Sequence, residues 1–188
     1  MIIEKTILQD AYIITPDVFG DNRGYFFESF SKEKLKFVFG GEFIQDNQSL
    51  STKKGVIRGL HCQSGKFSQT KLVRVVEGAV DDVIVDVRKK SPSYLKWIRV
   101  RLSSDNQKQL LIPKGFLHAF VTITDNVIFC YKVDEYYNKA SERGVLYNDP
   151  MFGIDWGVDN PILSDKDKAN PLFSNTDIDF VYHERAVK

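Results

Sequence analysis

Four side chains that can carry positive charge stand between Gly55 and Val73, and three of them, Arg58, His61 and Lys71, stand in stretches that otherwise resemble β-strands. A histidine with an ordinary pKa near ~6.5 can act as a general base at neutral pH. A guanidinium or an ammonium group binds anions and stabilises developing negative charge. An isolated strand histidine is usually a core residue, but three cationic groups are not buried together without an anion to meet them. We therefore interpret His61 as a functional residue.

A second histidine, His118, follows a polar turn, Pro113-Lys114-Gly115, and the chain has only three histidines in all. Taken alone, His118 fits a structural and a functional role equally well. Arg23 and Arg58 each precede a glycine, which lets a backbone approach a ligand closely. A plain turn explains these pairs equally well, and a solvated surface charge is the usual role of an arginine.

Two further candidates have strong structural alternatives. The segment Ser164-Asp165-Lys166-Asp167 resembles a capping box with a carboxylate at its third helical position, and the pattern alone favours a cap over catalysis by Asp167. Tyr131 shares a predicted strand face with Phe129, where aromatic side chains are usually part of the core. A phenol in a polar cavity can also donate a proton.

A metal site would be the obvious alternative use of two histidines near strand ends. A divalent transition metal needs three or four nitrogen, oxygen or sulfur ligands. The residue two positions after His61 is Gln63, and the next carboxylate is Glu77. Lys71 would repel a cation from the same place. We therefore expect no metal and no other cofactor.

The elements that must position these residues are strands. Apolar and polar residues alternate with a period of two, and β-branched residues and turn signals recur at short intervals. The predicted strands lie at 73–76, 80–88, 95–102, 109–112, 118–122 and 127–132. Brief helices are predicted after the capping residues Ser31 and Ser164. The pattern predicts an all-β sandwich or barrel.

Composition sets outer limits on the function. A length of 188 residues and a hydrophobic fraction of 43% suit one globular domain, and we expect a single domain over 1–188. A formal net charge of +1 gives no global attraction to nucleic acid or to membranes. We see no apolar run of about 20 residues and no secretion signal. Two cysteines do not suggest a disulfide framework, so we expect a cytoplasmic protein.

Several motifs occur in order along the chain and together resemble a known family. They are DNRGYFFE (21–28), QDNQS (45–49), GVIRGLH (55–61), QTKLV (69–73), DVIVD (82–86), IPKGFLH (112–118), YK (131–132) and LSDKD (163–167). This set is similar to the dTDP-4-dehydrorhamnose 3,5-epimerase family, whose members are cupin-type jelly rolls (double-stranded β-helices) with a few short helices. The resemblance covers about 6–172 and leaves 173–188 as a C-terminal extension. Cys62 and Ala119 stand where the family more often has an aromatic residue and a glycine.

The resemblance implies a metal-independent isomerase that inverts C3 and C5 of dTDP-4-keto-6-deoxy-D-glucose to give dTDP-4-keto-L-rhamnose, for dTDP-rhamnose and polysaccharide biosynthesis. The C4 ketone acidifies the C–H bonds on both neighbouring carbons. By the resemblance, His61 is the base and Asp167 its hydrogen-bond partner. Lys71 would stabilise the enolate, and Tyr131 would return a proton from the opposite face. This matching overrides the capping interpretation of Asp167, although that residue can serve both roles.

The resemblance also implies the substrate-binding set and a homodimer in which an amino-terminal strand reaches the neighbouring site. The implied binding residues are Arg23, Phe26, Glu28, Gln45, Asn47, Arg58, Lys71, His118, Tyr137, Glu142 and Lys166. Three alternatives remain open. They are an epimerase acting at one centre of a related nucleotide 4-keto sugar, a non-catalytic sugar-binding cupin, and a metal-dependent cupin oxygenase.

Overall fold

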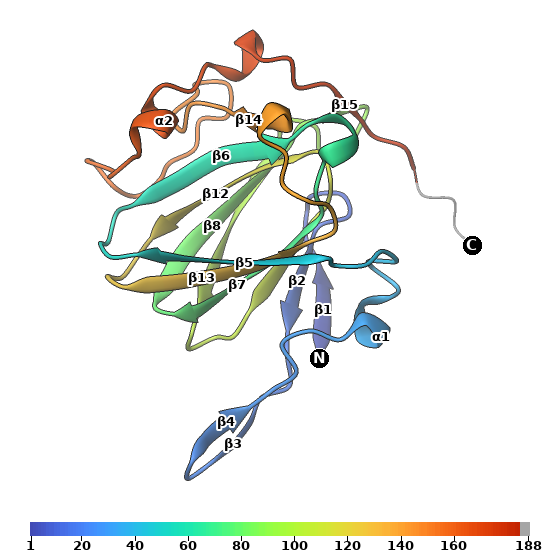
Figure 1. Ribbon diagram of the computed structural model, residues 1–188, viewed down its shortest axis with the longest axis vertical. Helices are drawn as coiled ribbons and strands as arrows, with labels where there is room; N and C mark the ends of the chain where they lie inside the picture. Colours follow the sequence, from blue (N-terminus) through green and yellow to red (C-terminus); the bar gives the residue numbers. More distant parts are fainter. Residues whose placement is uncertain (185–188) are drawn as a thin grey trace.

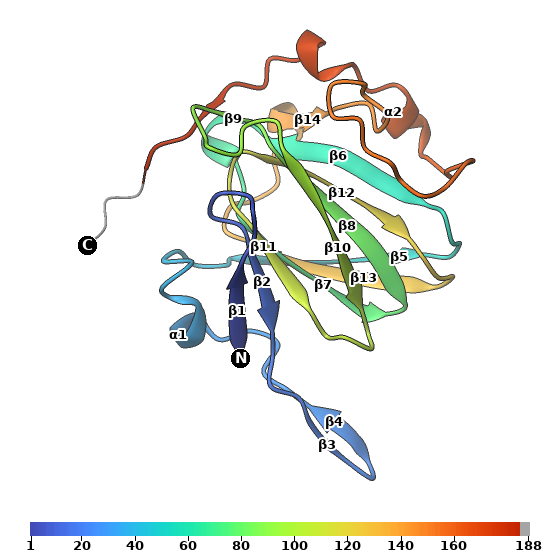
Figure 2. The ribbon, with the colours of Figure 1, turned by 180° about the vertical axis from the view of Figure 1, so that it is seen from behind.

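Two antiparallel β-sheets face each other in the computed structural model, which describes residues 1–184 (Figures 1 and 2). The six-stranded sheet has the order β1 (Ile2–Lys5), β2 (Tyr12–Thr15), β11 (Gln109–Ile112), β7 (Lys71–Glu77), β13 (Val127–Val133) and β5 (Gln45–Ser51). The five-stranded sheet has the order β10 (Trp97–Ser103), β8 (Ala79–Asp86), β12 (Phe116–Thr122), β6 (Ile57–Gln63) and β14 (Glu142–Gly144). The predicted all-β fold is confirmed.

Smaller elements lie outside these sheets. A hairpin of β3 (Phe19–Asp21) and β4 (Gly24–Phe26) projects away from the body in both views (Figures 1 and 2). Strand β15 (Phe180–Val181) runs parallel to β9 (Arg88–Lys89). The helices are α1 (Lys32–Leu35) and α2 (Asp165–Lys168), with single 3-10 turns at Gly65–Phe67, Lys139–Ser141 and Phe173–Asn175. Ser31 and Ser164 cap the two helices as predicted.

The predicted C-terminal extension, 173–188, is described only in part. Within it, Phe173–Asn175 forms a 3-10 turn and β15 adds to β9. Positions 185–188 lie outside the described residues. In the part of the chain that the structure describes, no helix is long and apolar enough to cross a membrane.

The apolar residues form three cores, because both faces of each sheet are partly covered. The first lies between the sheets and includes Val75, Ile84 and Phe129. The second lies between the outer face of the five-stranded sheet and the chain that follows β14, with Trp156 as its largest side chain. The third packs Leu35 of α1 against the outer face of the six-stranded sheet. Covering of both faces explains why β8 and β12 are almost continuously buried.

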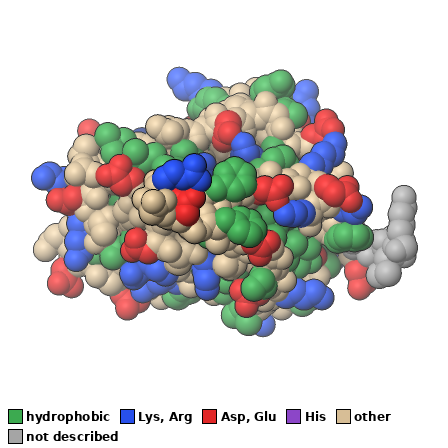
Figure 3. All heavy atoms as spheres, turned by 90° about the horizontal axis from the view of Figure 1, so that it is seen from below, with side chains coloured by type: hydrophobic (Ala, Val, Ile, Leu, Met, Phe, Trp, Pro, Cys, Tyr) green, Lys and Arg blue, Asp and Glu red, His purple; other side chains and the backbone are tan. Residues whose placement is uncertain are grey.

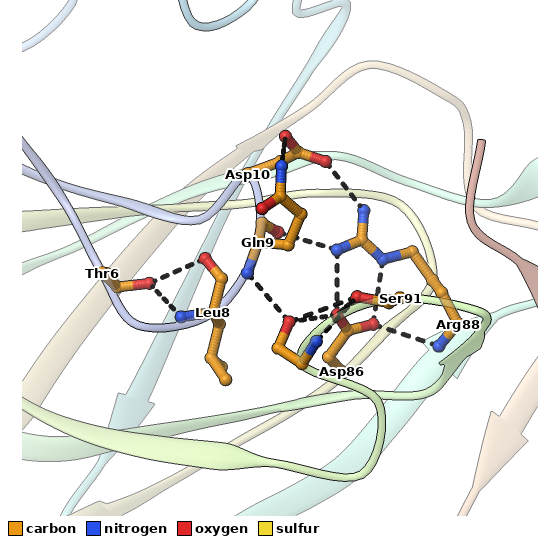
Figure 4. Close-up of polar contacts among 8 residues, drawn as sticks. Thr6, Leu8, Gln9, Asp10, Asp86, Arg88 and Ser91 are labelled. Carbon is orange, nitrogen blue, oxygen red and sulfur yellow. Dashed lines mark hydrogen bonds and ion pairs between the residues drawn. The ribbon is translucent and has the colours of Figure 1, made fainter. Parts of the chain in front are cut away.

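A buried ion-pair network joins the N-terminal segment to the end of β8 (Figure 4). Asp86 is fully buried and accepts hydrogen bonds from Arg88, Ser91 and Ser93. Arg88 also bonds Asp10, and its guanidinium lies 4.7 Å from the ring of Phe116 and 4.9 Å from that of Tyr182. Burial opposes ionisation of Asp86, but its hydrogen bonds outweigh burial and lower its pKa. The network therefore fixes the turn between β1 and β2 as a charged, fully bonded unit.

Candidate active site

Side chains from both sheets and from α2 line a cavity of about 310 Å³ inside the sandwich. The lining residues are Ser49, Arg58, His61, Lys71, His118, Phe120, Phe129, Tyr131, Ser164, Lys166 and Asp167. The set includes all four residues predicted to be catalytic and, besides Lys71, three more of those predicted to bind substrate. They come from β5, β6, β7, β12, β13 and α2 and its cap, so the sandwich brings together residues more than a hundred positions apart.

A β-bulge in β6 explains how Arg58 and His61 reach the same cavity. Residues three apart on a regular strand point to opposite faces. Here Arg58 lies opposite Phe120 and His61 lies opposite His118, so the register shifts between these pairs. Gly59 sits at the shift with a φ of 127°, and a Cβ there would lie 2.3 Å from the Cβ of Ala119. The bulge thus requires glycine and turns both polar side chains inward.

His61 and Asp167 form a hydrogen-bonded pair at the edge of the cavity. Nε2 of His61 lies 2.6 Å from Oδ1 of Asp167, while Oδ2 of Asp167 accepts a hydrogen bond from Oγ of Ser164 at 2.9 Å. The backbone N–H of Asp167 in turn donates to that Oγ at 3.1 Å. Burial raises the pKa of Asp167, but the bonds from His61 and Ser164 outweigh it and keep that pKa below its ordinary value. Asp167 is therefore both part of the helix cap and the partner of His61.

Lys71 and Tyr131 face the same cavity from the six-stranded sheet. Nζ of Lys71 lies 5.8 Å from the centre of the Tyr131 ring. Within residues 1–184 neither Nζ of Lys71 nor the hydroxyl of Tyr131 has a hydrogen-bond or ion-pair partner. Burial lowers the pKa of Lys71 and raises that of Tyr131. Both groups are thus free to meet a ligand, and Tyr131 keeps its proton at neutral pH.

His118 pairs with a residue that sequence reasoning did not select. Its Nε2 lies 2.9 Å from Oδ2 of Asp82, which is fully buried on β8. A signal was present, because two adjacent aspartates in an alternating strand cannot both face outward. Among the described residues, no group of three or more His, Cys, Asp or Glu side chains is placed to hold a metal ion.

Four other predicted binding residues, here called the rim, contact residues that line the cavity or one another: Gln45, Asn47, Tyr137 and Glu142. Lys166 pairs with Glu142 at 2.6 Å, and the hydroxyl of Tyr137 donates to the same carboxylate at 3.0 Å. On β5, Nε2 of Gln45 donates to Oδ1 of Asn47 at 2.8 Å, and Asn47 lies opposite Tyr131. These residues present amide, carboxylate, ammonium and aromatic groups beside the cavity.

Three predicted binding residues lie away from the cavity of their own chain. Arg23 and Phe26 belong to the projecting hairpin, where Arg23 pairs with Asp21 and the Phe26 residue is 68% exposed. Glu28 follows the hairpin and pairs with Lys34. None of the three lines the cavity of its own chain.

Comparison with known proteins identifies the family. The family model for dTDP-4-dehydrorhamnose 3,5-epimerase matches residues 5–175. The chain belongs to this family. Over 179 residues it is 48% identical to the dTDP-4-dehydrorhamnose 3,5-epimerase of Shigella flexneri, covering 94% of this chain and 98% of that one. The two-sheet fold and its similarity to solved structures of the family confirm the predicted cupin-type jelly roll. The predicted enzyme class is also confirmed, because an epimerase is an isomerase.

Solved structures of family members superimpose closely on this chain. The Bacillus anthracis dTDP-4-dehydrorhamnose 3,5-epimerase, with TDP and PPi bound, has a TM-score of 0.89 and 48% identity, covering 91% of this chain and 98% of its own. The Legionella pneumophila dTDP-6-deoxy-D-glucose-3,5-epimerase, in complex with dTDP-4-keto-L-rhamnose, has a TM-score of 0.92 and 41% identity, covering 97% and 98%.

Proposed function

We propose that this protein inverts C3 and C5 of dTDP-4-keto-6-deoxy-D-glucose and releases dTDP-4-keto-L-rhamnose. The observation that carries the proposal is the His61–Asp167 pair, which opens onto one cavity with Lys71 and Tyr131. A base, an electrostatic stabiliser and an acid are the groups that proton abstraction next to a ketone needs. Membership of the epimerase family supplies the substrate.

Each epimerisation transfers one proton off the sugar and one proton back. His61 takes the proton from C3 or C5, and the electron pair of that C–H bond forms the enolate whose charge rests on the C4 oxygen. Asp167 stabilises the imidazolium that results, as a carboxylate with a lowered pKa. Lys71 stabilises the enolate oxygen, and Tyr131 donates its proton to the opposite face of the carbon. Solvent then removes the proton from His61 and restores that of Tyr131.

Substrate binding follows the charges of the cavity and its rim. Arg58 is exposed at the cavity mouth, where its guanidinium bonds Ser51 and the carbonyl of Leu50 and keeps donors for the diphosphate. His118 faces the sugar from inside the cavity. The four rim residues and Lys166 contact the nucleotide or the sugar.

A homodimer completes the proposal, because Arg23, Phe26 and Glu28 lie outside the cavity of their own chain. Phe19, Tyr25 and Phe26 on the hairpin are each at least 60% exposed, which is unusual for large apolar side chains in one cluster. Figure 3 shows hydrophobic side chains among charged ones on the end of the molecule from which the hairpin projects. In the dimer each hairpin reaches the cavity of the partner, and Arg23 exchanges Asp21 for the substrate diphosphate.

Domain organisation and location in the cell are part of the same proposal. We assign 1–188 to a single domain, since β1 near the start of the chain joins the main sheet and the chain after β14 covers the other sheet. A cytoplasmic location is supported by two free cysteines, Cys62 and Cys130, which suit a reducing compartment.

The experiment that tests the function is proton NMR of dTDP-4-keto-6-deoxy-D-glucose with the purified protein in deuterated water. We expect deuterium at both C3 and C5 and new signals of dTDP-4-keto-L-rhamnose. Exchange at one carbon alone would replace the proposal with a single-centre epimerase. No exchange at either carbon, with dTDP still bound, would make the protein a sugar-binding cupin.

A further inference from the structure

Asp82 occupies a position where strand alternation calls for an apolar residue. On β8 it stands between Val80 and Ile84, which both belong to the core between the sheets. On the two neighbouring strands, Asp82 lies opposite Val100 of β10 and Phe120 of β12. Asp82 is fully buried, and placing a carboxylate there is unfavourable unless its charge is compensated. The position therefore indicates a role other than packing.

The hydrogen bonds of Asp82 account for only one of its two oxygens. Oδ2 accepts a hydrogen bond from Nε2 of His118 at 2.9 Å. Oδ1 is buried and has no partner among the described residues. In contrast, Asp86 at the end of the same strand has both oxygens bonded. Asp82 thus differs from a carboxylate held for structural reasons alone.

Two cations of the cavity, Arg58 and Lys71, have no carboxylate partner among the described residues. The titratable groups that face the cavity are Arg58 and His61 from β6, Lys71 from β7, His118 from β12, Tyr131 from β13, Glu142 from β14, and Lys166 and Asp167 from α2. Glu142 is committed to Lys166 and Asp167 to His61. Arg58 bonds only neutral groups, and Lys71 has no ion-pair partner in the described chain.

Asp82 is linked to the surroundings of Lys71 through His118, which bonds Asp82 and lines the same cavity as Lys71. Burial lowers the pKa of Lys71, while the charges of Cys62, Asp82 and Glu142 oppose that effect. Burial also raises the pKa of the Cys62 thiol to about 12, so Cys62 is neutral under ordinary conditions. Glu142 already pairs with Lys166, whereas Asp82 still has one oxygen without a partner among the described residues.

We propose that Asp82 is a positioning residue of the active site, which fixes the ring of His118 through Oδ2 and whose negative charge offsets the charge of Lys71 in the same cavity. The inference rests on the proposed function, since it matters for catalysis only if Lys71 stabilises an enolate. A neutral lysine could not supply that stabilisation, so the charge of Asp82 sets the highest pH at which the site works.

The variant Asp82→Asn separates charge from hydrogen bonding. The amide oxygen of asparagine can still accept the bond from Nε2 of His118, while the negative charge is lost. Asp81→Asn is the matched control, because Asp81 is the preceding residue of β8 and pairs with Arg101 on the other face of the sheet. The two variants change the formal charge equally. Asp82→Glu keeps the charge and tests rescue.

The measurement is kcat against pH for the four proteins. In Asp82→Asn we expect the alkaline limb to move to lower pH by about one unit or more, the size typical of losing a nearby opposite charge. Asp81→Asn should retain the wild-type profile, and Asp82→Glu should restore most of the alkaline limb. A uniform loss of rate in Asp82→Asn at every pH, with the limb in place, would overturn the proposal.

A second measurement needs no turnover. Competitive acetylation of the wild-type protein and of Asp82→Asn, read by mass spectrometry, compares the protonation of Lys71 in the two proteins. We expect Lys71 to become reactive at lower pH in Asp82→Asn, because the charge of Asp82 no longer opposes the lowering of the Lys71 pKa by burial. The same pH dependence of acetylation in both proteins would overturn the proposal. If the wild-type protein does not turn over, the proposed function fails while this measurement still decides the role of Asp82.

Discussion

His61 and His118 lie directly opposite each other on neighbouring strands β6 and β12, and each bonds a different carboxylate. The two histidine–carboxylate pairs differ in their exposure to solvent. The His61 side chain is 28% exposed beside a nearly buried Asp167, whereas the His118 and Asp82 side chains are 8% and 0% exposed. A base must reach the C–H bond and later exchange its proton with solvent. The difference supports our proposal that His61 is the base and that His118 has a supporting role.

The first prediction separates the two histidines. His61→Asn should lose deuterium incorporation at both C3 and C5 by about 10²–10⁴-fold, the usual contribution of a general base. His118→Asn should weaken turnover but keep exchange at both carbons. Proton NMR in deuterated water measures both variants, with dTDP binding as the test of folding. Equal loss of exchange in the two variants would contradict the assignment.

A second prediction concerns Lys71, whose ammonium meets more charge in the transition state than in the ground state. Lys71→Met should lower kcat by about 10²–10³-fold and change KM much less. Steady-state kinetics at several pH values checks this. If KM alone rose, Lys71 would be a substrate-binding residue and not a stabiliser of the enolate.

A third prediction tests whether the cap of α2 also serves the reaction. Ser164→Ala removes the hydroxyl that bonds both the backbone N–H and Oδ2 of Asp167. We expect a loss of about 0.5–2 kcal/mol in stability and a lower kcat, because the carboxylate loses its fixed orientation. Ser31→Ala is the control, since Ser31 caps α1 away from the cavity.

The comparison of the two caps decides the interpretation. Ser31→Ala should cost similar stability with no change in kcat. Thermal melting and kinetics of both variants give the two readouts. If Ser164→Ala loses stability but keeps the wild-type kcat, then Ser164 is only a helix cap.

A fourth prediction concerns acid stability and the network of Figure 4. The pKa of Asp86 is lower in the folded protein than its ordinary value, ~3.9, in the unfolded chain. Its contribution to stability is therefore complete above about pH 5 and is lost as the pH falls through these two values. Asp86→Asn should destabilise the protein at pH 7 by about 3 kcal/mol, because Arg88 remains buried without its main partner.

Denaturant unfolding from pH 7 to pH 3 measures that effect. The wild-type protein should lose stability steeply below pH 5, and Asp86→Asn should show a shallower loss. Parallel curves for the two proteins would mean that other carboxylates govern acid unfolding.

Much of the fold follows from local pattern. Alternation and turn residues predicted six strands from Val73 to Lys132, and the two capping serines predicted both helices. The polar strand β5 and the hairpin of β3 and β4 were not predicted as strands, because their residues carry little apolar alternation. An edge strand and an exposed hairpin do not need a buried face.

The residues of the site were predicted partly from residue type, partly from the family resemblance, and one of them was missed. Unusual residue types selected His61, Lys71 and Arg58, and the resemblance to a family supplied Asp167 and Tyr131. Strict alternation would have placed Arg58 and His61 on opposite faces, and only the bulge at Gly59 brings them together. Asp82 escaped notice because sequence shows two adjacent aspartates but not which one faces inward.

Tyr131 provides the most direct test of the two-sided mechanism. Its phenol faces the cavity across from β6, and burial holds its pKa above the ordinary value, so it is protonated at neutral pH, as the proposed acid must be. A protein that lacks only the acid can still form the enolate at His61. Tyr131→Phe retains the aromatic ring, which keeps lost packing small.

The deciding measurement is proton NMR of Tyr131→Phe with dTDP-4-keto-6-deoxy-D-glucose in deuterated water, which follows exchange and inversion in one sample. We predict continued deuterium exchange together with inversion slowed by about 10²-fold or more. His61→Asn should show neither exchange nor inversion. Inversion by Tyr131→Phe at the wild-type rate would contradict the account, since the second proton would then come from another group.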